Sequence, residues 1–299
     1  MRDNTPTLLS WARQALGVPL GAIPLSQCRI LRPYLLEQRG LKDASTVLMF
    51  AVPYVMAEDA LSPQRNVSVY AVAEDYHLYF SELSEALIPE LTRFFPGFQF
   101  AIFSDHSPIG EVEAAALCGL GCVGDHGLLI TPEYGSFVFL GEIITDMPWN
   151  TATGEVIFTP RDEVPRCEHC GACIATCPGK CLPNSRDTCV SAITQKKGSL
   201  TQEEKDYFSR QTLVWGCDIC QMSCPHNQNI LKSNISTPIQ YFRQNRQPKI
   251  DLYALQHMSN EDFAKRAYAW RGKAIIERNL ILQEGEHHAQ IDTGTHKKR

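Results

Sequence analysis

Hydrophobic residues recur at helical spacing near the N-terminus, and the spacing predicts helices over Leu8–Leu16 and Ile30–Arg39. The next apolar segment, Thr46–Tyr54, is short, nearly continuous and ended by a proline, which is typical of a buried strand. The segment Val69–His77 then leads into a long amphipathic helix that continues to about Phe95 and ends at a Pro-Gly dipeptide.

The same pattern predicts more strands and helices up to residue 150. A strand over Phe98–Phe103 is followed by the polar stretch Ser104–Pro108 and by a helix from about Ile109 to Cys118. Two further strands are expected over Gly127–Ile130 and Ser136–Thr145, joined by a turn. Because strands alternate with helices, we predict an α/β (α+β) layered domain over residues 1–150.

The rest of the chain is expected to divide into three parts. A mixed, proline-containing linker over Thr151–Arg166 opens a cysteine-rich domain at 151–235. A short helical segment at 236–284 follows, and the polar tail at 285–299 is expected to be disordered. Helical spacing predicts the helices Leu252–His257, Asn260–Tyr268 and Lys273–Gln283.

The composition favours a cytoplasmic, metal-binding protein. The chain has 299 residues and 12 cysteines, and its N-terminus lacks the apolar core of a signal peptide. Cysteines in a reducing compartment favour metal ligation over disulfides. No apolar run approaches the roughly 20 residues that would span a membrane. The net charge of −5 predicts no general attraction to nucleic acid or to anionic lipid.

Two cysteine runs carry the clearest chemistry. The first, from Cys167 to Cys177, has the spacing C-x2-C-x2-C-x3-C-P of bacterial ferredoxins. The second, from Cys217 to Cys224, has the same ending but one cysteine fewer. Four-iron clusters need four thiolates each, so seven of eight ligands are visible. By spacing alone, the eighth is Cys181 or Cys189. Structural zinc sites are the alternative, but they seldom carry a third closely spaced cysteine before a Cys-Pro.

A ferredoxin-type domain does not need 150 residues in front of it. The clusters are therefore expected to pass electrons to something held by the N-terminal domain. That domain has no GxGxxG, no Walker A run and no H-x-x-E-H-like metal-binding helix. By elimination, the acceptor is a flavin, a cobalamin or a bound partner.

Several segments together resemble the epoxyqueuosine reductase family, which comprises cobalamin-dependent iron–sulfur enzymes related to reductive dehalogenases. Each match is short, and the resemblance depends on their order and spacing. The matching segments are Tyr70-Ala71, Asp75-Tyr76-His77, Asp105 with Pro108 and Glu111, Gly119-Leu-Gly121 with Gly124, Gly135-Ser136, Leu140-Gly141-Glu142, Cys189-Val-Ser191-Ala-Ile-Thr194, Gly216-Cys217-Asp218 with Cys220-Gln221, and Arg278-Asn279.

The resemblance implies a nitroreductase-like domain that holds cobalamin against a ferredoxin-like domain with two [4Fe–4S] clusters. It assigns the eighth ligand to Cys189 and leaves Cys181 over. The implied ligands are Cys167, Cys170, Cys173 and Cys224 for the first cluster, and Cys177, Cys189, Cys217 and Cys220 for the second. Cys28, Cys118 and Cys122 are interpreted as small buried apolar residues.

The resemblance also implies a function with two alternatives. The first interpretation is a reductase that converts epoxyqueuosine to queuosine in tRNA. The others are a related cobalamin reductase with a smaller substrate, and a plain electron-transfer protein. We expect a monomer that is supplied by a flavodoxin- or ferredoxin-type donor, in a short form without the family's C-terminal helical repeats. Where the family carries Gly-Trp-x-Gly-Lys-Asn, this chain has Asp125 in place of the lysine.

Five residues are the candidate catalytic and cofactor-binding groups. Asp105 is the expected proton donor, with a pKa raised by burial beside the cofactor. Tyr76, His77, Ser191 and Thr194 are expected to contact cobalamin, as is Asp105.

Each candidate has a plainer interpretation. The Tyr-His pair could simply begin the long helix, Ser191 and Thr194 could cap the next helix, and Asp105 could cap the helix near Ile109. His106 is the rival proton donor. His169 lies inside the first cysteine run, and we do not expect it to bind metal.

Overall fold

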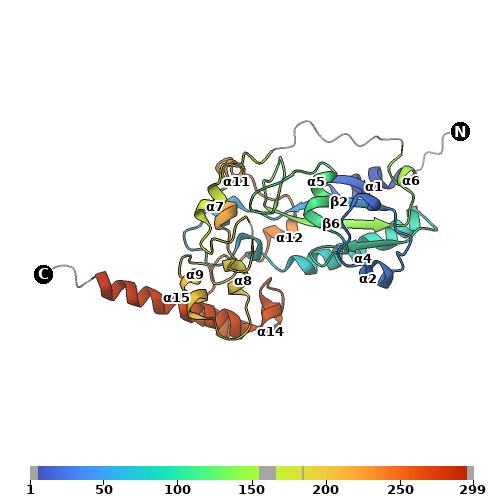
Figure 1. The fold of residues 1–299 in the computed structure, drawn as a ribbon. Coiled ribbons are helices and arrows are strands. Elements are labelled where there is room, and N and C mark those ends of the chain that lie inside the picture. Colours follow the sequence, from blue (N-terminus) through green and yellow to red (C-terminus); the bar gives the residue numbers. More distant parts are fainter. Residues whose placement is uncertain (1–5, 155–165, 184, 295–299) are drawn as a thin grey trace. The chain divides into compact units, whose positions relative to one another are not determined.

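The computed structural model describes residues 6–154, 166–183 and 185–294, with side chains described through residue 283. Contacts group the chain into two compact units, drawn in Figure 1. The first comprises Met1–Tyr54 and Tyr76–His169, and the second comprises Val55–Asp75 and Cys170–Arg299. Most of the predicted linker, residues 155–165, lies outside the described residues.

The first unit is built on a four-stranded antiparallel sheet. Its strand order is β1 (Leu20–Pro24), β2 (Thr46–Pro53), β6 (Val138–Thr145) and β3 (Phe100–Phe103). All three pairings are antiparallel, and Figure 1 shows β2 and β6 side by side. A separate two-stranded ribbon joins β4 (Cys122–Val123) to β5 (Leu129–Ile130). The domain is therefore of the α+β form, and all residues of β2 are buried, as its apolar sequence predicts.

The helices of the first unit agree with the predicted ones in type but less well in extent. They are α1 (Leu8–Leu16), α2 (Pro33–Gln38), α4 (Tyr76–Phe94), α5 (Glu111–Leu117) and α6 (Trp149–Thr153), with a 3-10 turn η1 at Leu25–Gln27. The bounds of α1 are confirmed: the Thr7 hydroxyl accepts from the Ser10 N–H, and Gly17 ends the helix at φ 62°. The start predicted for α2 at Ile30 is wrong, because Pro33 occupies the first helical position.

The core of this unit lies between the sheet and α5. Met49 and Ala51 of β2 belong to one buried cluster with Ala114 and Ala115 of α5. The sequence analysis missed β1, whose Gly21 lies against the end of α5. A Cβ at this position would come within 2.5 Å of the Cys118 carbonyl oxygen, so only glycine allows the approach.

The second unit is helical and joins two separate stretches of the chain. Its elements are α3 (Ala57–Ala60), η2 (Val69–Ala71), α7 (Ala172–Thr176), α8 (Val190–Thr194), α9 (Gln202–Phe208), α10 (Ile219–Met222), α11 (Pro225–Lys232), α12 (Gln240–Arg243), α13 (Leu252–His257), α14 (Asn260–Ala264), η3 (Ala269–Arg271) and α15 (Lys273–Gly294). Residues 55–75 group with this unit because Val67, Ala71 and Val72 pack in a buried cluster with Trp215 and Tyr268.

Two of the three predicted C-terminal helices differ in length from the observed ones. The bounds of α13 are as predicted, whereas α14 is shorter than expected. The helix α15 continues to Gly294, so the prediction of a disordered tail is wrong for residues 285–294. Residues 295–299 lie outside the described part.

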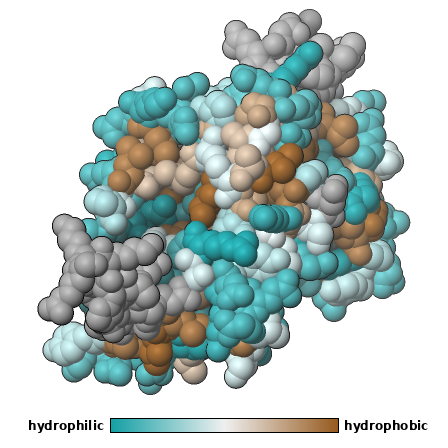
Figure 2. All heavy atoms as spheres, turned by 60° about the vertical axis from the view of Figure 1, so that its left-hand side comes forward, coloured by the Kyte–Doolittle hydropathy of each residue, from teal (hydrophilic) through white to brown (hydrophobic). Residues whose placement is uncertain are grey.

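Within the described ranges, no helix combines the length and the apolar character needed to cross a membrane. On the face drawn in Figure 2, hydrophobic residues occur in patches separated by hydrophilic ones. Exposed hydrophobic residues are common on the surfaces of folded proteins, and those seen here indicate no particular partner.

Candidate functional site

Short helices and turns of the second unit carry most of the two cysteine runs. Cys177 directly follows α7 with extended backbone, and Cys224 precedes α11, whose first residue is Pro225. The proline after each run thus lies where the chain changes direction. The Thr176 hydroxyl donates to the Ser223 hydroxyl at 3.0 Å, so the ends of the two runs are in contact.

Four thiols gather in the second unit: Cys177, Cys189, Cys217 and Cys220. Burial, together with the smaller effects of the neighbouring Asp218, Cys189 and Cys177, raises the pKa of Cys217 to about 12. Burial also raises the pKa of Cys220 to about 12, with Cys217, Asp218 and Cys189 nearby. These are the four residues that the resemblance assigns to the second cluster. Thiols in such a setting ionise only when a cation accompanies them, which bound iron would supply.

A fifth thiol belongs to the same group. Cys181 is buried, and its Sγ lies 3.5 Å from the Sγ of Cys177. Burial, followed by interactions with Cys177 and Cys189, raises the pKa of Cys181 to about 12. Both candidates for the eighth ligand are therefore present at this group, and the choice of Cys189 stays a prediction.

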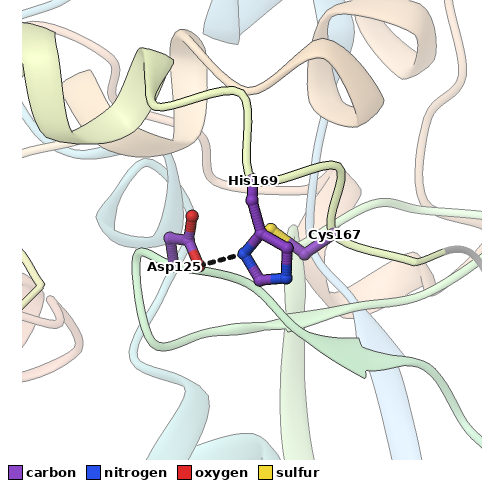
Figure 3. A group of neighbouring side chains, drawn as sticks. All are labelled: Asp125, Cys167 and His169. Carbon is purple, nitrogen blue, oxygen red and sulfur yellow. Dashed lines mark hydrogen bonds and ion pairs between the residues drawn. The ribbon is translucent and has the colours of Figure 1, made fainter.

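The ligands expected for the first cluster differ in exposure. Cys173 and Cys224 are buried, Cys170 is exposed and Cys167 is intermediate. In the first unit, the Cys167 thiol lies near Asp125 and His169, and Figure 3 shows these three side chains pointing toward one another. Their potential ligand atoms all lie within 4.8 Å of one another, and His169 Nδ1 is 2.8 Å from an Asp125 carboxylate oxygen. The carboxylate that replaces the family's lysine is thus paired with His169.

A buried ion pair between Arg65 and Asp218 holds the second cysteine run in place. The Asp218 carboxylate accepts from Arg65 Nη1 at 2.6 Å and from the backbone N–H of Val69 at 2.9 Å. It also accepts from the Ser68 hydroxyl. The side chains of Asp218 and Arg65 are only 2% and 8% exposed. The residue next to Cys217 therefore holds the segment 65–69 against the cysteine run.

The candidate proton donor lies after β3, where two other candidates reach it. The Tyr76 hydroxyl donates to Asp105 Oδ2 at 3.1 Å, and His77 Nε2 lies 3.6 Å from the same oxygen. The Tyr76 ring stacks on the Phe139 ring, with the ring centroids 4.2 Å apart. The centroid of the Tyr54 ring lies 4.5 Å from that of Phe139. The structure thus brings Tyr76, His77 and Asp105 together at one end of an aromatic stack.

The electrostatics of Asp105 differ from the expectation for a buried acid. Its side chain is 66% exposed, and its pKa is lowered, first because the His77 ring donates toward the carboxylate and also because of the Tyr76 hydrogen bond. Asp105 does not cap α5, whose N-cap is Gly110. Asp105 instead has φ 64°, and its backbone N–H donates to Glu111 Oε1 at 2.9 Å.

The remaining candidates lie elsewhere. His106 Nε2 is 3.3 Å from the Tyr34 hydroxyl and does not share the contacts of Asp105. Ser191 and Thr194 lie within α8, and neither caps it or α9, because the N-caps are Cys189 and Thr201. Thr194 is fully buried, and its hydroxyl accepts the Gly216 N–H at 3.0 Å. Contact of these residues with a cofactor stays a prediction.

A pair of carboxyl groups that the sequence analysis gave no role lies behind Asp105. Burial raises the pKa of Glu111 to about 7. Glu142 on β6 is completely buried, and burial raises its pKa well above the usual range, as does the nearby Glu111. The signal for this pair was present in the sequence, because Glu142 interrupts an otherwise apolar strand.

The comparison with known protein families first identifies the class of protein. Residues 166–227 match the family model of a 4Fe-4S double cluster binding domain. These residues include both cysteine runs and Cys181 and Cys189. The chain is thus an iron–sulfur protein with a double-cluster domain.

The relatives then specify the kind of protein. The chain is 29% identical to an epoxyqueuosine reductase of Lactococcus garvieae over 265 residues, which are 82% of this chain and 70% of that protein. It is 32% identical to one of Listeria monocytogenes over 70% of this chain and 54% of that protein. It therefore spans only about half the length of several relatives. The structure of epoxyqueuosine reductase from Streptococcus thermophilus matches with a TM-score of 0.70 and 25% identity, over 92% of this chain and 79% of that one. The resemblance to the epoxyqueuosine reductase family is confirmed.

Proposed function

We propose that this chain is a cobalamin-dependent iron–sulfur oxidoreductase that reduces epoxyqueuosine to queuosine in tRNA. One observation carries the proposal: a double-cluster domain occurs in one chain with a carboxylate, Asp105, held by Tyr76 and His77 at the end of an aromatic stack. The double-cluster domain can supply electrons, and the Asp105 carboxyl can supply a proton. The relatives that the chain matches over most of its length are named epoxyqueuosine reductases.

The cysteines fit the clusters that the domain implies. Nine thiols lie between Cys167 and Cys224, and two four-iron clusters need eight. Burial raises the pKa of the Cys217 and Cys220 thiols to about 12, so they would ionise as ligands only beside a cation, which bound iron would supply. Asp218 fixes the backbone of this run through its contacts with Arg65 and Val69.

The aromatic stack fits a large flat cofactor in its chemistry. Phe139, Tyr76 and the exposed ring of His77 stack in series, and Tyr54 lies tilted against Phe139. Cobalamin, when bound, supplies a strongly reducing cobalt centre. The chain's own residues would orient it through this aromatic surface and exclude water from Asp105.

Asp105 has the proton-handling role. Removing the epoxide oxygen as water consumes two electrons and two protons. The Asp105 carboxyl is positioned by hydrogen bonds at both its side chain and its backbone N–H, as a general acid requires. His77 and Tyr76 lower its pKa, and a ligand that covered the carboxyl would raise the pKa toward the range of a general acid.

The substrate and the cellular setting belong to the same proposal. A related structure that shares the fold, at 24% identity and a TM-score of 0.69, is that of an epoxyqueuosine reductase with an epoxyqueuosine-modified tRNA stem loop. We propose the same substrate here, in the cytoplasm, for a monomer supplied by a flavodoxin- or ferredoxin-type donor.

The test combines three measurements on anaerobically reconstituted protein. We expect about eight irons per chain, an altered optical spectrum on adding cobalamin, and conversion of epoxyqueuosine in tRNA. Clusters and cobalamin binding without tRNA turnover would favour a related reductase of a smaller substrate. Clusters without cobalamin binding under equilibrium dialysis would leave an electron-transfer protein.

A further inference from the structure

We propose that Glu111 and Glu142 form a carboxyl pair that shares one proton and holds Asp105 in its working position. Both are positioning residues, because they act on Asp105 and not on the substrate. The inference rests on the proposed function for the reaction that Asp105 serves. Its structural part concerns only the loop after β3 and can be tested without substrate.

The loop needs such support because the Asp105 backbone is in the left-handed region, at φ 64°. Residues other than glycine adopt this conformation at a cost and keep it only where neighbouring groups hold it. The backbone N–H of Asp105 donates to Glu111 Oε1 at 2.9 Å. On the other side of the loop, Arg32 Nη1 donates to the Ser107 carbonyl oxygen at 2.9 Å. Glu111 is therefore the acceptor that holds the strained residue itself.

Glu142 provides the second half of the pair. It lies on β6 opposite Phe103, the last residue of β3, and its side chain is completely inaccessible. Neither of its carboxyl oxygens has a hydrogen bond of ordinary geometry among the described residues. The polar side chains that approach it are those of Ser107 and Glu111. An ionised carboxylate in this position would be desolvated without compensation, so Glu142 carries a proton.

The proton on Glu142 explains the arrangement of the three carboxyl groups. Two ionised carboxylates repel each other, whereas a protonated Glu142 can donate to Glu111. Above its raised pKa of about 7, Glu111 then carries the negative charge that makes it a strong acceptor for the Asp105 N–H. In this arrangement Glu142 donates its O–H to Glu111, and Asp105 donates its backbone N–H to the same carboxylate. Truncating either glutamate removes the fixed acceptor or its support.

The charged groups around the pair are consistent with a single net negative charge. Arg32 and Asp105 both act on Glu111, the first favouring its ionised form and the second opposing it. On the other side, Cys28 stays a neutral thiol, because burial is the largest cause that raises its pKa to about 11. No described cation contacts Glu142 directly, so a proton is the available means of neutralising it.

Hydrogen–deuterium exchange on the full-length, cluster-loaded protein tests the positioning. In Glu111→Ala the Asp105 amide should exchange about tenfold faster, the effect of losing one hydrogen bond to a charged acceptor. Glu142→Leu, which cannot donate to Glu111, should have the same direction of effect. Glu142→Gln keeps a neutral donor of similar shape and should retain near-wild-type protection. Glu113→Ala is the matched control, because Glu113 lies on the same helix and contacts the exposed Arg29.

Turnover provides the second measurement. We expect Glu111→Ala to lower kcat at least tenfold with little change in KM, since a misplaced acid affects the transition state more than binding. Glu142→Gln should rescue what Glu142→Leu loses. Unchanged amide exchange in Glu111→Ala would overturn the proposal, and so would a Glu142→Gln variant as impaired as Glu142→Leu. If Glu142→Leu fails to retain iron, the Glu111→Ala and Glu142→Gln pair decides. Loss of protection in protein that never reduces epoxyqueuosine would support the pair and refute the proposed function.

Discussion

Removing the Asp218 carboxylate should strongly destabilise the unit that carries most of the cysteines. The carboxylate is 2% exposed and is paired with Arg65, which is 8% exposed. Breaking a buried pair by removing one partner costs about 3–5 kcal/mol, because the other charge stays buried. The Val69 N–H also loses its acceptor, but such losses are not additive within one network. We therefore expect Asp218→Ala to cost about 4 kcal/mol.

Thermal unfolding followed by circular dichroism under anaerobic conditions measures this effect. For a unit of roughly 150 residues, a loss of that size lowers Tm by on the order of 10 °C. A double-mutant cycle with Arg65→Met separates the pair from the other contacts, and the double variant should be less destabilised than the sum of the single variants by about 1–3 kcal/mol. Iron content measured in parallel distinguishes loss of a cluster from loss of the pair. A Tm within 2 °C of wild type, or strictly additive single variants, would refute the reasoning.

Three further predictions concern the clusters and the acid. Cys189→Ser should lower the iron content from about eight to about four per chain while Cys181→Ser leaves it unchanged; the reverse result in an iron assay would assign the eighth ligand to Cys181. Asp105→Asn should retain iron and cobalamin but lose turnover by about 10²-fold or more, and near-normal turnover in Asp105→Asn with none in His106→Gln would identify His106 as the acid. Cobalamin binding should raise the pKa of Asp105, seen as a protonated-carboxyl infrared band at neutral pH that is absent from Asp105→Asn; a spectrum without this band contradicts the assigned role.

Local signals in the sequence predicted the parts of the fold that depend on neighbouring residues. The helix α1 is bounded by a capping threonine and a left-handed glycine, and both are visible in the sequence. The two cysteine runs are similarly local, and they predicted the double-cluster domain that the family comparison confirms. Where the signal was weaker, the bounds shifted, as at α2, which starts at Pro33.

Features that depend on long-range pairing could not be read in the same way. The strand β1 has only five residues and includes Gly21, so its apolar pattern is too short to distinguish it from a loop. The alternation of strands and helices also does not specify strand direction. The rule that ligands lie at the carboxyl ends of strands applies to parallel sheets, whereas this sheet is antiparallel. The antiparallel sheet therefore gives no general reason to expect a catalytic group after β3, where Asp105 lies.

The environment of Asp105 could not be predicted from the sequence, because it combines residues from three separate elements. Tyr76 and His77 begin α4, Glu111 begins α5, and Glu142 lies on β6. Of these residues, only Glu142 is recognisable as unusual from the sequence alone, because it is an ionisable residue inside an apolar strand. The sequence could indicate that a carboxyl group is buried there, but not which group would share its proton.

The three carboxyl groups of this site have different roles, because they differ in burial and therefore in protonation state. Glu142 is buried and must be neutral, so its protonation does not depend on a ligand. Asp105 is mostly exposed and is ionised at neutral pH, because His77 and Tyr76 favour its anion. Glu111 accepts the backbone N–H of Asp105 and, in our proposal, also accepts the proton that Glu142 donates. Covering Asp105 would remove its solvation and raise its pKa, while Glu111 keeps its position unchanged. In the proposed reaction, Asp105 would then donate a proton only when the cofactor and substrate are bound. Protonation of the reduced cofactor in the absence of substrate would thereby be avoided.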